Sequence, residues 1–263
     1  MTKSKKKICI ISPCHWAACF GGSEYQLKLL LEILAARGLF DITYLARDVN
    51  PSFSSPEYSI ICVSYKYRIR RYSFLFDARN LLSALNSIRP EVILQRVGCA
   101  YTGIAAYYAK NNSCKMIWFV ANDSDVCPSP GKFSLNYIFR FLDKKALEYG
   151  IKHADYIITQ TGNEADLLFR YYGRTANAIV SNFHPLPQEN IEKGRQIEIV
   201  WVANMKPKKQ PEVFLRIAKD LQSIKGVRFI MIGNAYKNEW SNNLLRKIAA
   251  VENLEYLGKR SLA

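Results

Sequence analysis

The chain has 263 residues, of which 49% are hydrophobic and 13% aromatic, so it can bury a large core and is not a disordered polypeptide. Its apolar stretches are all shorter than the roughly 20 residues that a membrane-spanning helix needs. The formal net charge of +15 favours an anionic partner, such as a nucleotide diphosphate, a lipid phosphate, a membrane surface or nucleic acid.

The N-terminal segment and the cysteines bear on the cellular compartment. Basic residues 5–7 and the apolar run after them resemble a signal peptide, and residues 17–19 (Ala-Ala-Cys) resemble a lipoprotein cleavage box. Pro13 and His15 interrupt this run and a strand–loop–helix pattern follows, so we expect the segment to belong to the fold. Seven cysteines without a C-x-x-C pair favour a reducing, cytosolic compartment and no structural zinc.

Short apolar strands alternate with helices along the first two thirds of the chain. Residues 8–11 form the first predicted strand, Gly21-Gly22 a loop, and Ser23 with Gln26 fits an S-x-x-Q capping box of a helix that ends at Gly38. Further strands are predicted at residues 42–46, 59–64, 92–95, 116–120, 156–159 and 178–181. Helices are predicted between them at residues 74–88, 104–109, 135–149 and 164–172.

A second β/α series follows a segment at 184–196 that is rich in proline and charge and is typical of an exposed linker. Its predicted elements are strands at 197–202, 228–232 and 254–257 and helices at 212–224 and 239–251. The alternation predicts an α/β fold with two Rossmann-like doubly wound domains, residues 1–183 and 197–263. We expect the second to be incomplete, because three strands are about half of the usual six.

Several short motifs follow one another along the chain in a characteristic order. Gly21-Gly22-Ser23-Glu24 follows the first strand, and Val180-Ser181-Asn182 precedes the linker. The second series opens with Trp201-Val202-Ala203-Asn204-Met205-Lys206-Pro207-Lys208-Lys209-Gln210-Pro211-Glu212, and its next strands end in Gly233 and Gly258. Together these motifs resemble glycosyltransferase family 4, a retaining family with the GT-B fold. The resemblance implies an acceptor domain at 1–183, a donor domain at 197–263, and metal-independent transfer of a sugar from a nucleotide-diphosphate sugar to a saccharide or lipid-linked acceptor.

The resemblance also assigns the donor site. Gly21, Gly22 and Lys209 would hold the diphosphate, and Asn204 stands where the family usually has an arginine. A glycine pair lets a phosphate approach the N-terminus of a helix, and a lysine stabilises charge as the sugar–phosphate bond breaks. The G-x-G-x-x-G spacing of dehydrogenases is absent from this loop. The alternative is that these lysines form a solvated helix entry.

Asn122-Asp123-Ser124-Asp125 follows the strand at 116–120, so its side chains should emerge at the carboxyl edge of the sheet. Asn122 takes the place of a histidine found in many relatives, so Asn122 and Asp123 are the candidates to meet the reacting sugar, with no nucleophile assigned. Two alternatives remain open. The two aspartates fit the D-x-D metal site of the GT-A fold, or the segment is a helix-capping acidic turn.

The acceptor-side candidates are His15, Glu24, Arg68, Arg70 and Arg71. The arginines alternate with aromatic and apolar residues, which suits an anionic acceptor or a membrane surface, although a solvated loop fits equally well. His15 is a candidate acid, base or donor, but a lone histidine is more often structural. We expect a cytoplasmic protein, with peripheral contact at the inner membrane face as an option, that uses no metal or cofactor and binds no nucleic acid.

One alternative belongs to another functional class. The family's E-x7-E segment, which meets the donor sugar and nucleotide, is expected after Gly258, and residues 259–263 do not contain it. On this alternative the chain is a truncated, catalytically inactive relative that binds an anionic ligand or a partner.

Overall fold

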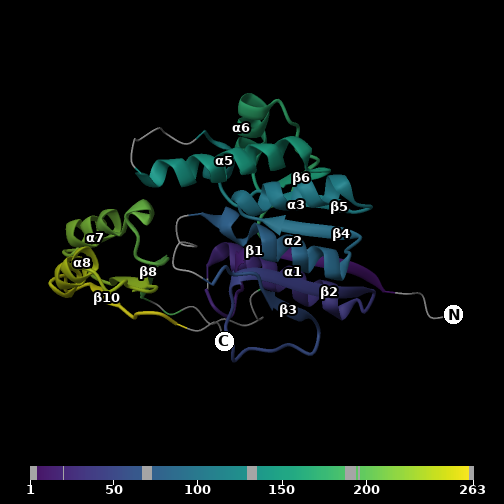
Figure 1. Cartoon of the computed structure of the whole chain (residues 1–263). Coiled ribbons are helices and arrows are strands. Elements are labelled where there is room, and N and C mark those ends of the chain that lie inside the picture. Colours follow the sequence, from purple (N-terminus) through teal and green to yellow (C-terminus); the bar gives the residue numbers. More distant parts are fainter. Residues whose placement is uncertain are drawn as a thin grey trace. The chain divides into compact units, whose positions relative to one another are not determined.

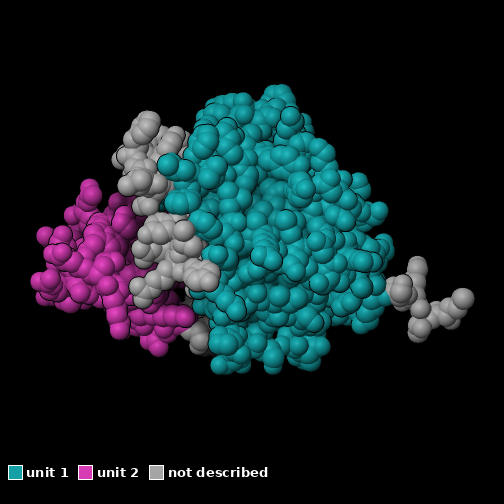
Figure 2. Space-filling model, viewed as in Figure 1, with its two compact units in different colours: residues 1–184 teal, residues 185–263 magenta. Residues whose placement is uncertain are grey.

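A computed structural model of the chain describes residues 5–19, 21–66, 73–128, 135–186, 194 and 196–260 (Figure 1). The chain forms two compact units, Met1–His184 and Pro185–Ala263, which we describe separately (Figure 2). Each unit combines a parallel sheet with helices. The predicted α/β class with two Rossmann-like units is therefore confirmed.

Unit 1 is built on a seven-stranded parallel sheet with the strand order β3-β2-β1-β4-β5-β6-β7. Its strands are β1 (Lys6–Cys14), β2 (Phe40–Asp48), β3 (Ser59–Cys62), β4 (Val92–Arg96), β5 (Lys115–Phe119), β6 (Tyr156–Thr159) and β7 (Ala178–Ile179). Its helices are α1 (Gly22–Ala36), the 3₁₀ helix η2 (Phe74–Asp77), α2 (Ala78–Ile88), α3 (Ala100–Asn111), α4 (Asp123–Val126), α5 (Leu135–His153) and α6 (Gly162–Tyr172).

Two hydrophobic clusters cover the two faces of this sheet. Successive side chains of a strand point to opposite faces, so Cys9 and Ile11 of β1 join one cluster while Ile8 and Ile10 join the other. The first cluster includes residues of α2 and α3, and the second includes Leu27 and Leu31 of α1. Burial of both faces explains why the strands are nearly continuous apolar runs.

Unit 2 contains a three-stranded parallel sheet with the order β10-β9-β8. Its elements are β8 (Ile197–Val202), the 3₁₀ helix η3 (Pro207–Lys209), α7 (Pro211–Asp220), β9 (Val227–Ile232), α8 (Glu239–Ala249) and β10 (Leu254–Tyr256). Phe229 and Met231 of β9 pack with Ala218 of α7 and with Leu244 and Ile248 of α8. The two helices thus cover one face of the sheet.

The predicted capping box at the start of α1 is wrong. The N-cap residue is Gly21, which has an extended backbone and makes no side-chain capping bond. The Ser23 hydroxyl instead accepts a hydrogen bond from Arg96 Nε at 3.1 Å, and the Gln26 side chain is bound to the backbone of Phe183. A long-range network therefore uses the polar side chains that local reasoning assigned to the cap.

The cysteines also differ from expectation. Cys14 and Cys19 form a disulfide bond, which the expectation of a uniformly reduced set did not foresee. Among the described cysteines, Cys9, Cys62, Cys99, Cys114 and Cys127 are free. Of the helices that the structure describes, none has the length and hydropathy that a membrane crossing requires.

Candidate functional site

The glycine loop lies at the carboxyl end of β1. Helix α1 begins at Gly22, and its first helical hydrogen bond runs from Tyr25 N to Gly21 O at 2.9 Å. A β-carbon added at Gly22 would meet no atom within 4 Å, whereas one at Gly21 would lie 2.6 Å from the Glu24 carboxylate. The first-turn N–H groups lack intrahelical partners, so the open side at Gly22 suits an anion, with Glu24 folded over Gly21 beside it.

Arg96, the last residue of β4, is the functional candidate that sequence reasoning missed. It is only 7% exposed, and its guanidinium donates to Ser23 Oγ at 3.1 Å and to Asn182 Oδ1 at 3.0 Å. Both acceptors are neutral, and no carboxylate of the described residues lies within 4.0 Å of this group. Burial lowers the pKa of Arg96, while the more distant Glu164, Asp125 and Glu24 raise it.

Arg96 connects the glycine loop with the segment that leaves unit 1. Asn182 accepts its hydrogen bond, the Gln26 amide exchanges two hydrogen bonds with the Phe183 backbone at 2.7 and 3.0 Å, and Tyr25 stacks on His184. The asparagine of the valine–x–asparagine motif thus has a structural role. In the sequence, the apolar run 92–94 is followed by Gln95 and then by Arg96, and this change to polar residues at the strand end was the available signal for Arg96.

The acidic turn after β5 is occupied by its own hydrogen bonds. Asn122 caps α4, because its side chain accepts from Ser124 N at 3.0 Å. Asp125 is 5% exposed and accepts from Ala121 N at 2.9 Å and from Asn122 Nδ2 at 3.1 Å, while Asp123 is exposed. Burial raises the pKa of Asp125. The geometry favours the capping alternative over a D-x-D metal site, and the two parallel sheets argue against the GT-A fold.

Glu164 closes a second turn at this edge. Its carboxylate accepts from Gln160 N at 2.6 Å, and its own backbone N–H donates to the N-cap Thr161 at 3.1 Å. Gln160 in turn donates to Val120 O at 2.9 Å, which joins the ends of β5 and β6. Glu164 is 3% exposed, and burial raises its pKa. It serves as a structural cap at the edge of the site.

His15 lies in an aromatic cluster rather than at an open surface. It is 0% exposed and packs against Tyr44 and Phe53. Ala17 N donates to its Nδ1 at 3.2 Å, so the neutral ring carries its proton on Nε2 and donates to the Tyr58 hydroxyl at 3.1 Å. Burial lowers its pKa to about 4. These contacts favour the structural alternative for His15.

Arg68, Arg70 and Arg71 lie outside the described residues, but the segments on either side of them meet a buried ion pair. Arg47 at 8% exposure and Asp77 at 0% are joined by a 2.6 Å contact. Asp77 also accepts from Tyr65 N at 2.7 Å, and Arg47 donates to Ser73 O at 2.7 Å. The ion pair therefore holds the described residues that flank the basic segment.

The corresponding edge of unit 2 is strongly basic. The loops that follow its three strands, residues 203–210, 233–238 and 257–260, contain no aspartate or glutamate. Their six cations are all exposed: Lys206, Lys208, Lys209, Lys237, Lys259 and Arg260. Parallel strands bring these loops to one edge, so the arrangement suits a phosphorylated ligand.

Close backbone packing shapes this edge. Gly233 has a φ of +151°, and a β-carbon there would lie 1.7 Å from Ala203 O. Asn204 Oδ1 accepts from Asn234 N at 3.3 Å, so this side chain joins two of the loops. Lys209 ends η3, and α7 starts at Pro211 without a side-chain cap. A lysine and an uncapped helix start thus follow the first strand of unit 2.

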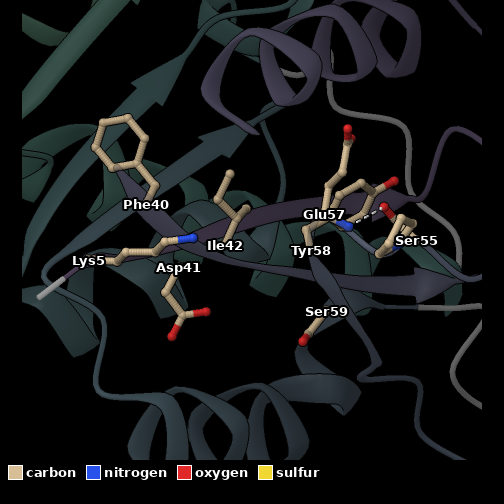
Figure 3. Close-up of a pocket in the computed structure, with 9 residues that line it drawn as sticks. Lys5, Phe40, Asp41, Ile42, Ser55, Glu57, Tyr58 and Ser59 are labelled. Carbon is tan, nitrogen blue, oxygen red and sulfur yellow. Dashed lines mark hydrogen bonds between the residues drawn. The ribbon is translucent and has the colours of Figure 1, made fainter. Parts of the chain in front are cut away.

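A hollow of about 400 Å³ lies elsewhere, beside the amino-terminal half of β2 (Figure 3). Phe40, Asp41 and Ile42 line one side and residues 55–59 the other, with Lys5 near Asp41. Ligands of parallel sheets bind at the carboxyl ends of strands, so we do not place the site in this hollow. Unit 1 instead brings Gly21, Gly22, Glu24 and Arg96 together, and unit 2 brings together Asn204 and Lys209.

No protein-family model matches the chain, and no curated protein matches it. Solved structures with a similar fold include WaaG, a glycosyltransferase involved in lipopolysaccharide biosynthesis, with a TM-score of 0.67 at 13% identity, covering 97% of this chain and 70% of that one. The lipopolysaccharide outer core galactosyltransferase WaaB has a TM-score of 0.57 at 16% identity, with 97% and 68% covered. A putative UDP-N-acetylglucosamine 2-epimerase from Listeria monocytogenes has a TM-score of 0.59 at 12% identity, with 98% and 70% covered. At these identities the likeness shows the GT-B type of fold.

Proposed function

We propose that this chain binds a nucleotide-diphosphate sugar and acts as a retaining, metal-independent glycosyltransferase of family 4. The observation that carries the proposal is a feature common to both units. The first strand of each sheet leads into an uncapped helix start, at Gly22 in unit 1 and at Pro211 beside Lys209 in unit 2. Helix N-termini and lysines are groups that bind phosphates. The fold shared with WaaG and WaaB supports the same class.

In this proposal the diphosphate is bound by the backbone at Gly21 and Gly22 and by Lys209. Asn204 offers no positive charge where the family has an arginine, so Lys206 or Lys208 supplies the second cation. Both lysines are exposed on the loop that contains Asn204. The charge that develops on the departing phosphate is stabilised by these cations. Asn122 and the exposed Asp123 are the proposed residues near the reacting sugar.

The acceptor is proposed to be a saccharide or a lipid-linked saccharide. The basic segment with Arg68, Arg70 and Arg71 would attract a lipid phosphate or an anionic membrane surface. We also propose a cytoplasmic location, with peripheral contact at the inner membrane face, and a role in polysaccharide biosynthesis. This location fits a donor substrate that is a nucleotide sugar.

Titration of the purified chain with UDP and with a panel of labelled sugar nucleotides tests the proposal. We expect binding that weakens about 10- to 100-fold in Lys209→Ala, because a charged hydrogen bond contributes about 1.5–3 kcal/mol. Lys225→Ala, which removes an exposed lysine outside the three basic loops, is the matched control. Transfer activity that persists in EDTA is expected, whereas its loss would favour a metal-dependent enzyme.

A nucleotide-sugar protein without transferase activity is the second candidate, favoured by the epimerase among the similar structures. Analysis of the reaction mixture separates the outcomes. Transfer to an acceptor supports the glycosyltransferase, and conversion of UDP-N-acetylglucosamine at C2 supports an epimerase. Binding without turnover supports a ligand-binding protein, and the absence of any binding contradicts all three.

A further inference from the structure

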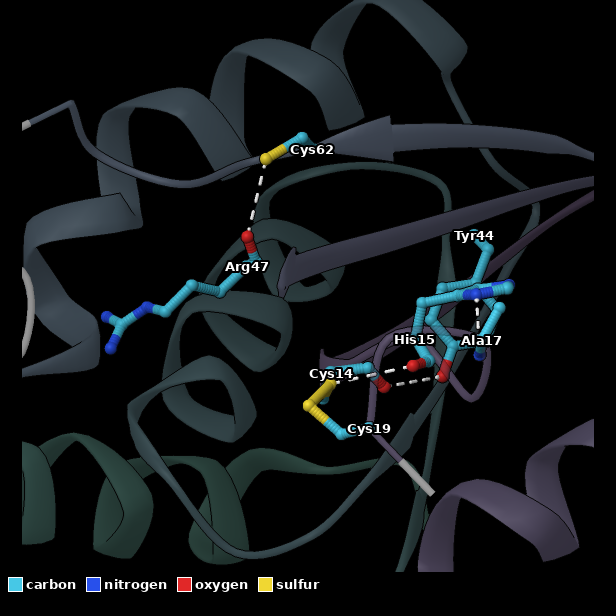
Figure 4. The surroundings of a disulfide bond; sticks show 7 residues. All are labelled: Cys14, His15, Ala17, Cys19, Tyr44, Arg47 and Cys62. Atoms are coloured by element: carbon cyan, nitrogen blue, oxygen red, sulfur yellow. Dashed lines mark hydrogen bonds between the residues drawn. A yellow bond between two sulfur atoms is a disulfide. The ribbon is translucent and has the colours of Figure 1, made fainter. Parts of the chain in front are cut away.

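The loop between β1 and α1 is closed by the disulfide bond between Cys14 and Cys19 (Figure 4). Cys14 is the last residue of β1 and is buried, whereas Cys19 is exposed. In the sequence only Phe20 separates Cys19 from Gly21, the N-cap residue of α1. The bond therefore ties the chain just before the glycine pair to the end of an inner strand of the sheet.

We propose that Cys14 and Cys19 form a reversible thiol–disulfide site that controls the conformation of the Gly21-Gly22 loop. In the oxidised state the loop is held beside β1, and in the reduced state it is released. A consequence for nucleotide affinity rests on the proposed function, because that function places the diphosphate at this loop. The control of loop conformation does not depend on it.

The remaining cysteines are poorly suited to this chemistry. Cys9, Cys99 and Cys114 are buried, and burial raises the pKa values of their thiols to about 12, 12 and 11, which keeps them protonated and unreactive. Cys62 is exposed, but among the described residues Cys14 and Cys19 form the one disulfide. Cys127 is partly exposed and also free, so the Cys14–Cys19 pair is the disulfide of the described residues that a dithiol reagent can reduce.

Contacts of His15 limit what reduction would release. Ala18 N and Cys19 N both donate to His15 O, at 2.9 and 3.0 Å, and the His15 side chain is buried. His15 O also lies 3.5 Å from Cys14 Sγ and offers an acceptor to the thiol formed there. The first part of the loop therefore stays anchored without the disulfide. Mobility should increase at the glycine pair, Gly21 and Gly22.

The exchange reaction starts at Cys19, the exposed residue of the pair. A thiolate of a dithiol reductant attacks Cys19 Sγ, the S–S bond breaks, and Cys14 leaves as a thiolate that takes up a proton. The second thiol of the reductant then attacks the mixed disulfide, which releases Cys19 and leaves the reductant as a cyclic disulfide. Two electrons and two protons pass to the protein. A carboxylate oxygen of Asp48 lies within 4.8 Å of both sulfur atoms, and its negative charge favours the protonated thiols.

Thiol labelling and amide hydrogen exchange of the full chain test the proposal. After equilibration with oxidised glutathione, N-ethylmaleimide should leave Cys14 and Cys19 unmodified, and dithiothreitol should make both reactive. Exchange of the Tyr25 amide, which donates to Gly21 O, should be at least fivefold faster in the reduced chain. Cys19→Ser should show the fast exchange under both conditions, and Cys62→Ser, an exposed cysteine outside the pair, should behave like the unmodified chain.

Two results would overturn the proposal: labelling of both cysteines after oxidation, or equal exchange of the Tyr25 amide in the two states. Titration with UDP in each state adds a separate outcome. A weaker affinity in the reduced state, by about tenfold, supports control of nucleotide binding, and equal affinities refute that consequence. If UDP binds in neither state, the proposed function fails while the exchange data still decide the thiol–disulfide site.

Discussion

Strands β1 and β8 hold the same position in their sheets but differ in burial. The orders β3-β2-β1 and β10-β9-β8 correspond strand by strand. In each sheet the first strand along the chain, β1 or β8, precedes the loop that we assign to phosphate binding. In unit 1, β4 pairs with the other edge of β1, and Ile10 and Ile11 are 0% exposed. In the described part of unit 2, β8 pairs with β9 alone, and Val200 and Val202 are 46% and 72% exposed.

This difference shows that strand order alone does not set the contribution of a strand to stability. An inner strand buries both faces and both edges, whereas an edge strand leaves backbone groups and side chains open to association. The charges differ in the same way. Unit 1 buries its ion pair between Arg47 and Asp77, while the partners of Arg228 in unit 2 are more than 40% exposed. We therefore expect single substitutions to affect unit 1 more strongly.

The largest effect is expected for Asp77→Ala in unit 1. The substitution leaves the Arg47 guanidinium buried without its carboxylate, which should lower the free energy of unfolding of this unit by about 3–5 kcal/mol. Glu198→Ala, which removes an exposed partner of Arg228, is the control in unit 2 and should cost less than about 1 kcal/mol. Urea unfolding followed by hydrogen exchange reports each unit separately. Equal costs at the two pairs would contradict the difference in burial.

Substitutions in the two corresponding strands come next. Ile10→Ala removes a fully buried side chain and should cost about 2–5 kcal/mol, whereas Val200→Ala should cost below about 1 kcal/mol because that side chain is half exposed. The same unfolding measurement checks both values. A cost at Val200 that matches the cost at Ile10 would mean that β8 is covered in solution.

A histidine-linked pH dependence confined to unit 1 is the third expectation, because all three histidines of the chain, His15, His153 and His184, belong to it. The pKa of His15 is lowered from 6.5 to about 4, so the unfolded chain takes up the proton first. The contribution of neutral His15 to the free energy of unfolding is complete above pH 6.5. It is lost as the pH falls towards 4, and the loss is at most about 3 kcal/mol.

The measurement compares unfolding of the unmodified chain and of His15→Gln between pH 7.5 and 4.5. Buried carboxyl groups with raised pKa values, such as Asp125 and Glu164, act in the opposite direction, so the difference between the two chains isolates His15. A difference that stays constant over this range would show that His15 titrates normally in the folded protein.

The smallest effect is expected for Asn182→Ala, which removes one acceptor of the buried Arg96 guanidinium and should cost about 1.5–3 kcal/mol. Asn243→Ala removes an exposed acceptor of Arg246 in unit 2 and should change stability by less than about 0.5 kcal/mol. Faster hydrogen exchange at residues 182–184 would mark the loss of the contact. Unchanged exchange there would contradict the role of Arg96 in holding this segment.

The order and type of the elements were predictable, because each strand is a short apolar run with β-branched residues and polar breaks around it. The boundaries of the elements were less predictable. Helix α3 begins at Ala100, four residues before its predicted start, since it is buried on nearly all sides and lacks an amphipathic period. The segment predicted as one helix at 74–88 is η2 followed by α2. β7 ends at Ile179, before the predicted 181.

The candidate site was only partly readable in the sequence. The glycine pair and Lys209 lie in the loops that follow β1 and β8, so the local pattern could predict them as candidates. Arg96 meets Ser23 and Asn182 across separations of 73 and 86 residues, and the exposure of Asp123 against the burial of Asp125 depends on a close approach to Gly98. Such long-range contacts leave no periodic trace in one sequence. The disulfide was missed for a similar reason, since it needs the loop geometry between β1 and α1.

Arg96 is followed by Val97, which has a φ of +76°. A β-branched residue in the left-handed region costs about 1–3 kcal/mol, and the Gln95 amide helps to hold this turn by donating to Val97 O at 2.7 Å. Directed evolution of this protein for heat resistance should therefore enrich glycine at position 97. If variants selected for activity keep valine there, the strained turn has been retained for its effect on the position of Arg96.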